Sequence, residues 1–186
     1  MNPEHTAGSL AKSPRRRALL YTSVGVVAAA AGAGAAWWKW RPGEGATGVT
    51  ADFWPMIFDT PNGPPLAMRS LQGKPLLLNF WATWCPPCVE EFPLLDTFFK
   101  QNSARSWQVL GLAIDQPSAV RAFLQRTPVS FPIGIAGLEG SELSKAFGNS
   151  SGGLPFSVVI GASGQVLQRR IGRVTAAELA QWAGSA

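Results

Sequence analysis

Residues 76–88 read LLLNFWATWCPPC and contain the only two cysteines of the chain, Cys85 and Cys88. The apolar run from Leu76 to Trp81 predicts a buried strand, and its continuous leucines suit a central strand covered on both faces. The cysteines follow at the predicted start of a helix, whose dipole favours a thiolate on the first of them. Because two cysteines at this spacing can also close a disulfide, the stretch predicts a dithiol that exchanges electrons through sulfur.

Two other roles for the cysteine pair, a zinc site and a structural disulfide, are less well supported by the sequence. A tetrahedral zinc site needs two more ligands, and the only histidine, His5, lies in the amino-terminal tail. A structural disulfide across so short a loop would remove little chain entropy and would stabilise the fold poorly. Redox chemistry is therefore favoured, and we expect no metal and no cofactor besides the redox-active cysteine pair.

The two prolines between the cysteines affect the first sulfur. If Cys85 caps the helix, Pro86 and Pro87 occupy its first turn, where a missing amide hydrogen costs least. Neither proline can donate to the Cys85 sulfur, so the nearest backbone donor is the amide of Cys88. We expect a Cys85 thiol that is accessible, acidified below the free value of about 8.5 and able to attack, and a deeper Cys88 that resolves the mixed disulfide.

The net charge of +5 resides in residues 1–43, which hold six basic residues and one acidic residue. Residues 44–186 hold ten basic and ten acidic residues and carry no net charge. The basicity is therefore typical of a targeting segment, and the remainder shows no basic patch for phosphate. We expect no nucleic-acid partner.

Residues 18–38 form a run of 21 residues without a charge. At about 1.5 Å per helical residue, this run spans the roughly 30 Å of a bilayer core. Four basic residues precede it, and Trp37, Trp38 and Trp40 lie at its end as an aromatic anchor. The positive-inside rule makes residues 1–17 a cytoplasmic basic tail and residues 18–38 a transmembrane signal anchor. Residues 39–50 form a tether, and residues 51–186 form one domain on the periplasmic or extracytoplasmic side.

Cleavage of this segment is the alternative, because the small residues near Ala33 to Ala36 resemble a signal-peptide cleavage site. Arg16 and Arg17 also resemble a twin-arginine signal. Retention is favoured, since the apolar run is longer than the core of about 7–15 residues in typical signal peptides. Both alternatives export the domain.

The rest of the chain alternates between predicted strands and predicted helices. Strands are predicted at 54–59, 66–68, 74–81, 107–114, 131–135, 156–160 and 166–171. Helices are predicted at 86–101, 117–126, 139–147 and 175–182, the last with Thr175 and Glu178 as a capping box. This order predicts an α/β domain with a mixed central sheet flanked by helices on both faces.

Two motifs resemble those of the thioredoxin superfamily, and within it the membrane-tethered TlpA, ResA and CcmG group. The first is the run 78–88 followed by EEFP at 90–93, and the second is the run GLPFSVVI at 153–160 with Gly164 and Gly172. The resemblance implies a thioredoxin fold with an amino-terminal hairpin extension and a central βα insertion. It also implies reduction of disulfides in exported clients, such as apocytochrome c or copper-site proteins, and re-reduction by a membrane donor of the DsbD or CcdA type.

The same resemblance implies a role for Glu91. Ordinary thioredoxins carry an Asp six residues before the first cysteine, whereas this chain has Asn79 there. The ResA-like pattern instead places an acid six residues after that cysteine, and Glu91 matches it. We expect Glu91 to shuttle the Cys88 proton and to raise the thiol pKa by like-charge repulsion. Its neighbour Glu90 fits a solvated helix acid better.

A client-binding groove is implied beside the cysteines. The Leu154–Pro155 bond is expected to be cis, and the exposed edge at Leu154 is expected to pair with an extended client segment. Trp84 is expected to wall this groove, together with Pro86 and Pro87, whereas Trp81 fits core packing better. These residues complete the predicted site.

Other functions on this fold stay open as alternatives. A copper-delivery protein would require a histidine ligand and a wider cysteine spacing, and residues 51–186 have neither. A non-catalytic interaction domain would not require a reactive Cys85. An oxidase of the DsbA kind would require a helical insertion domain, for which the segment between Ile114 and Leu154 leaves little room.

Overall fold

The computed structural model describes residues 50–184. The predicted basic tail, transmembrane anchor and nearly all of the tether lie outside these residues. Among residues 50–184, every helix is too short or too polar to span a bilayer.

The described part of the chain alternates between strands and helices in the predicted order. Its strands are β1 (Ile57–Phe58), β2 (Leu66–Ala67), β3 (Leu76–Trp81), β4 (Gln108–Ala113), β5 (Ile133–Ile135), β6 (Phe156–Ile160) and β7 (Val166–Ile171). Its helices include α3 (Pro86–Asn102), α4 (Pro117–Arg126), α5 (Gly140–Ala146) and α6 (Ala176–Ala183), with short 3₁₀ turns η1 (Met68–Leu71) and η2 (Ser103–Arg105).

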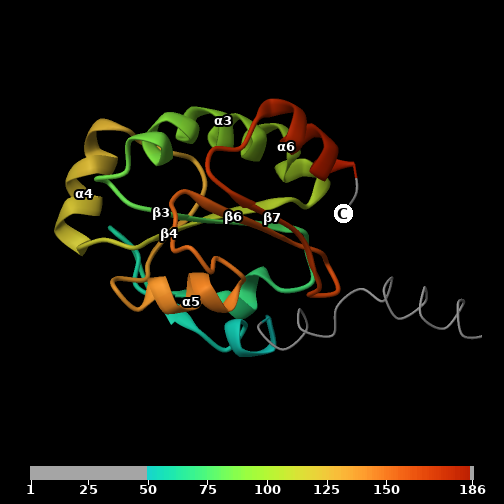
Figure 1. Cartoon of the computed structure of the whole chain (residues 1–186), viewed down its shortest axis with the longest axis horizontal. Coiled ribbons are helices and arrows are strands. Elements are labelled where there is room, and N and C mark those ends of the chain that lie inside the picture. Colours follow the sequence, from blue (N-terminus) through green and yellow to red (C-terminus); the bar gives the residue numbers. More distant parts are fainter. Residues whose placement is uncertain (1–49, 185–186) are drawn as a thin grey trace, which may run out of the picture. The chain divides into compact units, whose positions relative to one another are not determined.

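Five strands form a mixed sheet in the order β5-β4-β3-β6-β7 (Figure 1). Strands β3, β4 and β5 are parallel, whereas β6 and β7 run antiparallel to their neighbours. The leucine-rich strand β3 lies at the centre, as its sequence predicted. The carboxyl ends of β3 and β4 therefore lie side by side, and the loops that follow these two strands can form one site.

Helices cover both faces of this sheet (Figure 1): α3, α4 and α6 lie on one face, and α5 lies on the other with the segment 50–71. Side chains of a strand alternate between the two faces. Leu77 and Trp81 accordingly belong to the core beneath α3, whereas Leu76 and Phe80 belong to the opposite core. By the same alternation, Asn79 lies on the α3 face, where it is fully buried. A polar side chain on a buried face requires a polar partner.

The two additions that the family resemblance implied are present. Strands β1 and β2 form an antiparallel hairpin of their own. Its loop is held by Thr60, whose side chain accepts from the Gly63 amide at 3.0 Å and donates to the Pro64 carbonyl at 3.1 Å. The elements β5 and α5 lie between α4 and β6 as the central insertion.

The prediction of a strand at residues 54–59 was wrong over most of that length. The segment 54–59 forms a strand only at Ile57 and Phe58, and it is preceded by a helical turn at residues 50–53. The Trp54 amide donates to the Thr50 carbonyl at 3.1 Å, and Trp54 packs against Phe53 with ring centroids 5.2 Å apart. Because burial of these two aromatic rings against the sheet favours the turn, tertiary packing overrides strand propensity here.

Candidate active site

The two cysteines lie where β3 passes into α3, and they are joined by a disulfide with an S–S distance of 2.02 Å. Cys85 is the N-cap residue of α3, with extended backbone, and prolines occupy the first helical positions. The Cys88 amide donates to the Cys85 Sγ at 3.3 Å. This is the backbone donor that the two prolines predicted, and with the helix dipole it stabilises negative charge on that sulfur.

The two cysteines differ in exposure, but less than expected. Cys85 is 5% exposed and Cys88 is fully buried. The predicted accessible Cys85 is therefore largely covered in this oxidised state, because both cysteines pack within the core that includes Trp81 and Phe92. Cys85 still retains the small opening to solvent that Cys88 lacks. The prediction that Cys88 is the more deeply buried of the two cysteines is confirmed.

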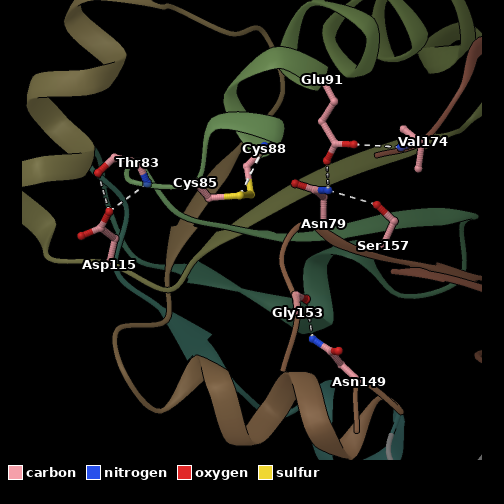
Figure 2. The surroundings of a disulfide bond; sticks show 10 residues. All are labelled: Asn79, Thr83, Cys85, Cys88, Glu91, Asp115, Asn149, Gly153, Ser157 and Val174. Carbon is pink, nitrogen blue, oxygen red and sulfur yellow. Dashed lines mark hydrogen bonds between the residues drawn. A yellow bond between two sulfur atoms is a disulfide. The ribbon is translucent and has the colours of Figure 1, made fainter. Parts of the chain in front are cut away.

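Glu91 is almost completely buried, at 1% exposed, on the second turn of α3. Its Oε1 accepts from the Asn79 Nδ2 at 2.7 Å, and its Oε2 accepts from the Val174 amide at 3.0 Å (Figure 2). Burial raises the pKa of Glu91, and the hydrogen bonds from Val174 and Asn79 and the charge of Arg173 oppose this rise only in part. An acid in this setting holds its proton at a higher pH than a surface carboxyl does.

Glu90, the preceding residue, has a different environment. It is exposed and pairs with the Arg173 guanidinium at 2.7 Å. The sequence interpretation of Glu90 as a solvated helix acid is confirmed. Since Arg173 pairs with Glu90 and the next amide, of Val174, donates to Glu91, the loop between β7 and α6 is attached to the first turns of α3.

Asn79 connects Glu91 to the neighbouring strand β6. Its Nδ2 also donates to the Ser157 Oγ at 3.0 Å, across the β3–β6 pair in which Asn79 and Ser157 are opposite one another (Figure 2). The Asn79 Oδ1 is buried and has no hydrogen-bond partner within residues 50–184. Sequence reasoning singled out Asn79 but missed Ser157 and Val174, because only the strand register and the β7–α6 loop bring them to Glu91.

The expected cis peptide bond is present at Leu154–Pro155. Leu154, which precedes β6, lines a groove of about 490 Å³ together with Trp84, which precedes Cys85. Trp84 is 66% exposed, whereas Trp81 is fully buried. Pro86 is exposed and Pro87 half-buried. Of the predicted client-binding residues, Trp84 and Leu154 therefore share one groove. Leu154 is half-buried rather than exposed, and Pro155 is buried, because it directly precedes β6 in the sheet. Trp81 lies in the core as expected.

Asp115, two residues after the end of β4, was not predicted as a site residue. Its Oδ2 accepts from both the amide and the hydroxyl of Thr83, at 2.9 and 2.5 Å (Figure 2). Its Oδ1 accepts from the Gln116 amide at 2.7 Å. It also lines the groove of Trp84 and Leu154. A signal for it was present in the sequence, because an acid two residues after β4, the parallel neighbour of β3, lies beside the loop that follows β3.

A second polar side chain supports the loop before Pro155. Asn149 is fully buried, and its Nδ2 donates to the Gly153 carbonyl at 2.9 Å and to the Ser144 Oγ at 2.8 Å. It therefore connects the end of α5 to the segment that carries Leu154 (Figure 2). Within residues 50–184, no group of three or more histidine, cysteine or acidic side chains lies close enough together to hold a metal ion.

Comparison with known proteins agrees with this geometry. The sequence matches the Redoxin family model over residues 55–181. It is 30% identical over 118 residues to the thiol-disulfide oxidoreductase ResA of Bacillus cereus, covering 63% of this chain and 66% of that relative. The chain thus matches about two thirds of the length of that relative.

Two solved structures are similar over nearly their whole length. One is a thiol:disulfide interchange protein of the thioredoxin family from Chlorobium tepidum, with 32% identity and a TM-score of 0.61 over 70% of this chain and 92% of that one. The other is a thioredoxin-related protein from Neisseria meningitidis, with 31% identity and a TM-score of 0.62 over 70% of this chain and 97% of that one.

Proposed function

The chain belongs to the Redoxin family, as a TlpA/ResA/CcmG-like member of the thioredoxin superfamily, and we propose that it is a thiol-disulfide oxidoreductase that reduces disulfides of exported proteins. One observation carries this proposal. The Cys85–Cys88 disulfide lies at the amino terminus of α3 with the Cys88 amide directed at the Cys85 sulfur. That arrangement stabilises a thiolate on Cys85, the cysteine that is not completely buried.

The first step of the reaction uses Cys85. In the reduced protein, the Cys85 thiolate attacks one sulfur of a client disulfide. A bond forms between Cys85 and that sulfur, the client S–S bond breaks, and the other client sulfur leaves as a thiolate with the electron pair. Trp84 and Leu154, which line the groove at this surface, contact the client segment.

The second step uses Cys88 and Glu91. These residues are three positions apart on α3, so their side chains lie on the same face of the helix, and both are buried. The Cys88 thiol transfers its proton to the Glu91 carboxylate, and the resulting thiolate attacks the Cys85 sulfur. The Cys85–Cys88 bond forms as the mixed disulfide breaks, so the client gains two electrons and the cysteine pair loses two. The raised pKa of Glu91 suits a group that takes up this proton.

The oxidised pair must then be reduced again. We propose that the donor is a membrane thiol-disulfide protein of the DsbD or CcdA type, and that residues 18–38 anchor the domain on the outer side of the cytoplasmic membrane. The uncharged run and the basic residues before it support this location. Clients of the proposed reaction are exported proteins with oxidised cysteines, such as apocytochrome c or a copper-site protein.

A trapping experiment tests the proposal. The reduced Cys88→Ser protein is mixed with an oxidised peptide that contains Cys-x-x-Cys-His, the haem-attachment motif of c-type cytochromes. Intact-mass spectrometry is expected to show the peptide attached to Cys85, whereas Cys85→Ser is expected to form no adduct. Wild-type protein is expected to release reduced peptide. Trapping through Cys88 in the Cys85→Ser protein would reverse the assignment, and no peptide reduction by the wild type would refute the reductase.

A further inference from the structure

Asp115 makes an unusual set of contacts for a half-buried carboxylate. Its three hydrogen bonds come from two backbone amides and one hydroxyl, and it belongs to none of the ion pairs within residues 50–184. Since charge-assisted hydrogen bonds are roughly twice as strong as neutral ones, this carboxylate fixes backbone. It joins the loop after β3, through Thr83 (Figure 2), to the start of α4, through the Gln116 amide.

The residue next to this anchor is Trp84. With 66% of its surface exposed, Trp84 has little packing to fix its orientation. The backbone on its two sides is fixed instead. Thr83 donates its amide hydrogen to Asp115. The Cys85 amide donates to the Ala82 carbonyl at 3.3 Å, and Cys85 is also the N-cap of α3. The direction of the Trp84 Cα–Cβ bond therefore depends on these anchors, which include the two hydrogen bonds from Thr83 to Asp115, and this direction limits where the indole can lie at the groove.

Trp84, which directly precedes Cys85, lines one groove with Asp115 and Leu154. None of the three hydrogen bonds of Asp115 reaches a sulfur. We propose that Asp115 is a positioning residue that acts through Thr83 to hold the Trp84 indole at the client groove. This inference rests on the proposed reductase function and assigns to Asp115 the alignment of the client rather than a step in sulfur chemistry.

The variant Thr83→Val tests the hydrogen bond between the Thr83 hydroxyl and Asp115 by itself. It keeps the size of the side chain and the charge of the site, and it removes the hydroxyl that donates to Asp115 at 2.5 Å. Thr83→Ser keeps that hydroxyl and is expected to restore wild-type behaviour. Thr97→Val is the matched control, because its exposed hydroxyl donates to the Pro93 carbonyl at 2.8 Å, on the side of α3 away from the groove.

Kinetics separate alignment of the client from thiol chemistry. The reduced full-length chain, in mild detergent, is mixed with excess oxidised Cys-x-x-Cys-His peptide or with 5,5′-dithiobis(2-nitrobenzoate), a small disulfide that does not require the groove. The cysteine pair supplies the two electrons of a single turnover, and the rate against disulfide concentration gives the half-saturating concentration (KM) and the limiting rate (kcat). For Thr83→Val we expect KM for the peptide to rise about tenfold, the equivalent of one hydrogen bond. We expect kcat and the rate with the small disulfide to change by less than about twofold. Equal losses with both disulfides would overturn the inference.

A double-mutant cycle tests whether Asp115 acts through Trp84. Trp84→Ala alone is expected to raise KM at least as much as Thr83→Val. In the Trp84→Ala background, Thr83→Val is then expected to add nothing, because the side chain that it positions is absent. A full further rise of about tenfold, or no effect of Trp84→Ala, would refute the proposal.

A second measurement requires no client. The protein is labelled with 5-fluorotryptophan, and the Trp84 resonance is assigned in the ¹⁹F spectrum by its loss in Trp84→Phe. Thr83→Val is expected to shift or broaden that resonance, whereas Thr97→Val is expected to leave it unchanged. An unchanged Trp84 resonance in Thr83→Val overturns the inference even if the peptide is a client. Failure of the wild type to reduce the peptide instead refutes the proposed function, and the ¹⁹F result still decides the role of Asp115.

Discussion

Replacing Glu91 by Gln tests how the burial of this carboxyl affects the stability of the fold. The pKa of Glu91 in the folded protein is raised above 4.5, chiefly by desolvation. Between that ordinary value and the raised one, the folded state binds more protons than the unfolded state. The free energy of unfolding therefore falls as pH rises through this window. Above the window, the ionised carboxylate destabilises the fold by about 1.4 kcal/mol for each unit of the rise.

Gln at this position cannot ionise, yet it can retain the hydrogen bonds. Its oxygen can accept from the Val174 amide, and its NH₂ can donate to the Asn79 Oδ1, which has no partner within residues 50–184, if the Asn79 amide rotates. At pH 4.5, below the raised pKa of the folded-state carboxyl, we expect the unfolding free energies of wild type and Glu91→Gln to differ by no more than one ordinary hydrogen bond, about 0.5–1.5 kcal/mol.

The expected result is a difference that depends on pH. Relative to the wild type, Glu91→Gln gains stability as pH rises above 4.5, with a slope of at most about 1.4 kcal/mol per pH unit, and then reaches a plateau. Urea unfolding of the oxidised proteins at pH 4.5, 6 and 8, with equal m-values, measures this difference. The carboxyl of Glu178, whose pKa is lowered by hydrogen bonds from Thr175, is present in both proteins and cancels.

Glu90→Gln is the matched control. Glu90 is exposed, and surface ion pairs like the one it forms with Arg173 contribute about 0–1 kcal/mol. We expect the free energy of unfolding of Glu90→Gln to differ from that of the wild type by the same amount at all three pH values. If the Glu91→Gln curve is also parallel to that of the wild type, the carboxyl is not desolvated in the folded protein, and its assignment as a tuned proton acceptor fails.

Three further substitutions test the packing around the site by urea unfolding. Gly111→Ala places a Cβ 2.7 Å from the Ile133 Cδ1 in the sheet, so we expect a loss of about 1–3 kcal/mol; a neutral effect would contradict the close contact. Thr175→Ala removes the capping box of α6 and is expected to cost about 1 kcal/mol, with Thr175→Ser nearly neutral; equal losses in both would exclude the cap as the cause. Asn149→Ala leaves the Gly153 carbonyl without this donor and is expected to cost about 1–3 kcal/mol, and a change below 0.5 kcal/mol would contradict that role.

Local patterns determined most of the secondary structure. The leucine run predicted the central strand, and the cysteines and prolines after it predicted the cap and first turn of α3. The hairpin of β6 and β7 and the capping box of α6 were also correct. Each of these features depends on residues that are neighbours in the sequence. The segment 54–59 was predicted less well, because its conformation depends on packing against distant parts of the sheet.

The sequence by itself determined the reactive pair, its order and its nearest backbone donor, since two cysteines and two prolines at a helix start leave little choice of geometry. Only the tertiary structure decided which groups surround that pair. The register of β3 with β6 sets Ser157 opposite Asn79, and the parallel β3–β4 pair brings Asp115 to Thr83. These contacts join residues that are far apart along the chain, because a sheet orders its strands in space by pairing and burial rather than by sequence.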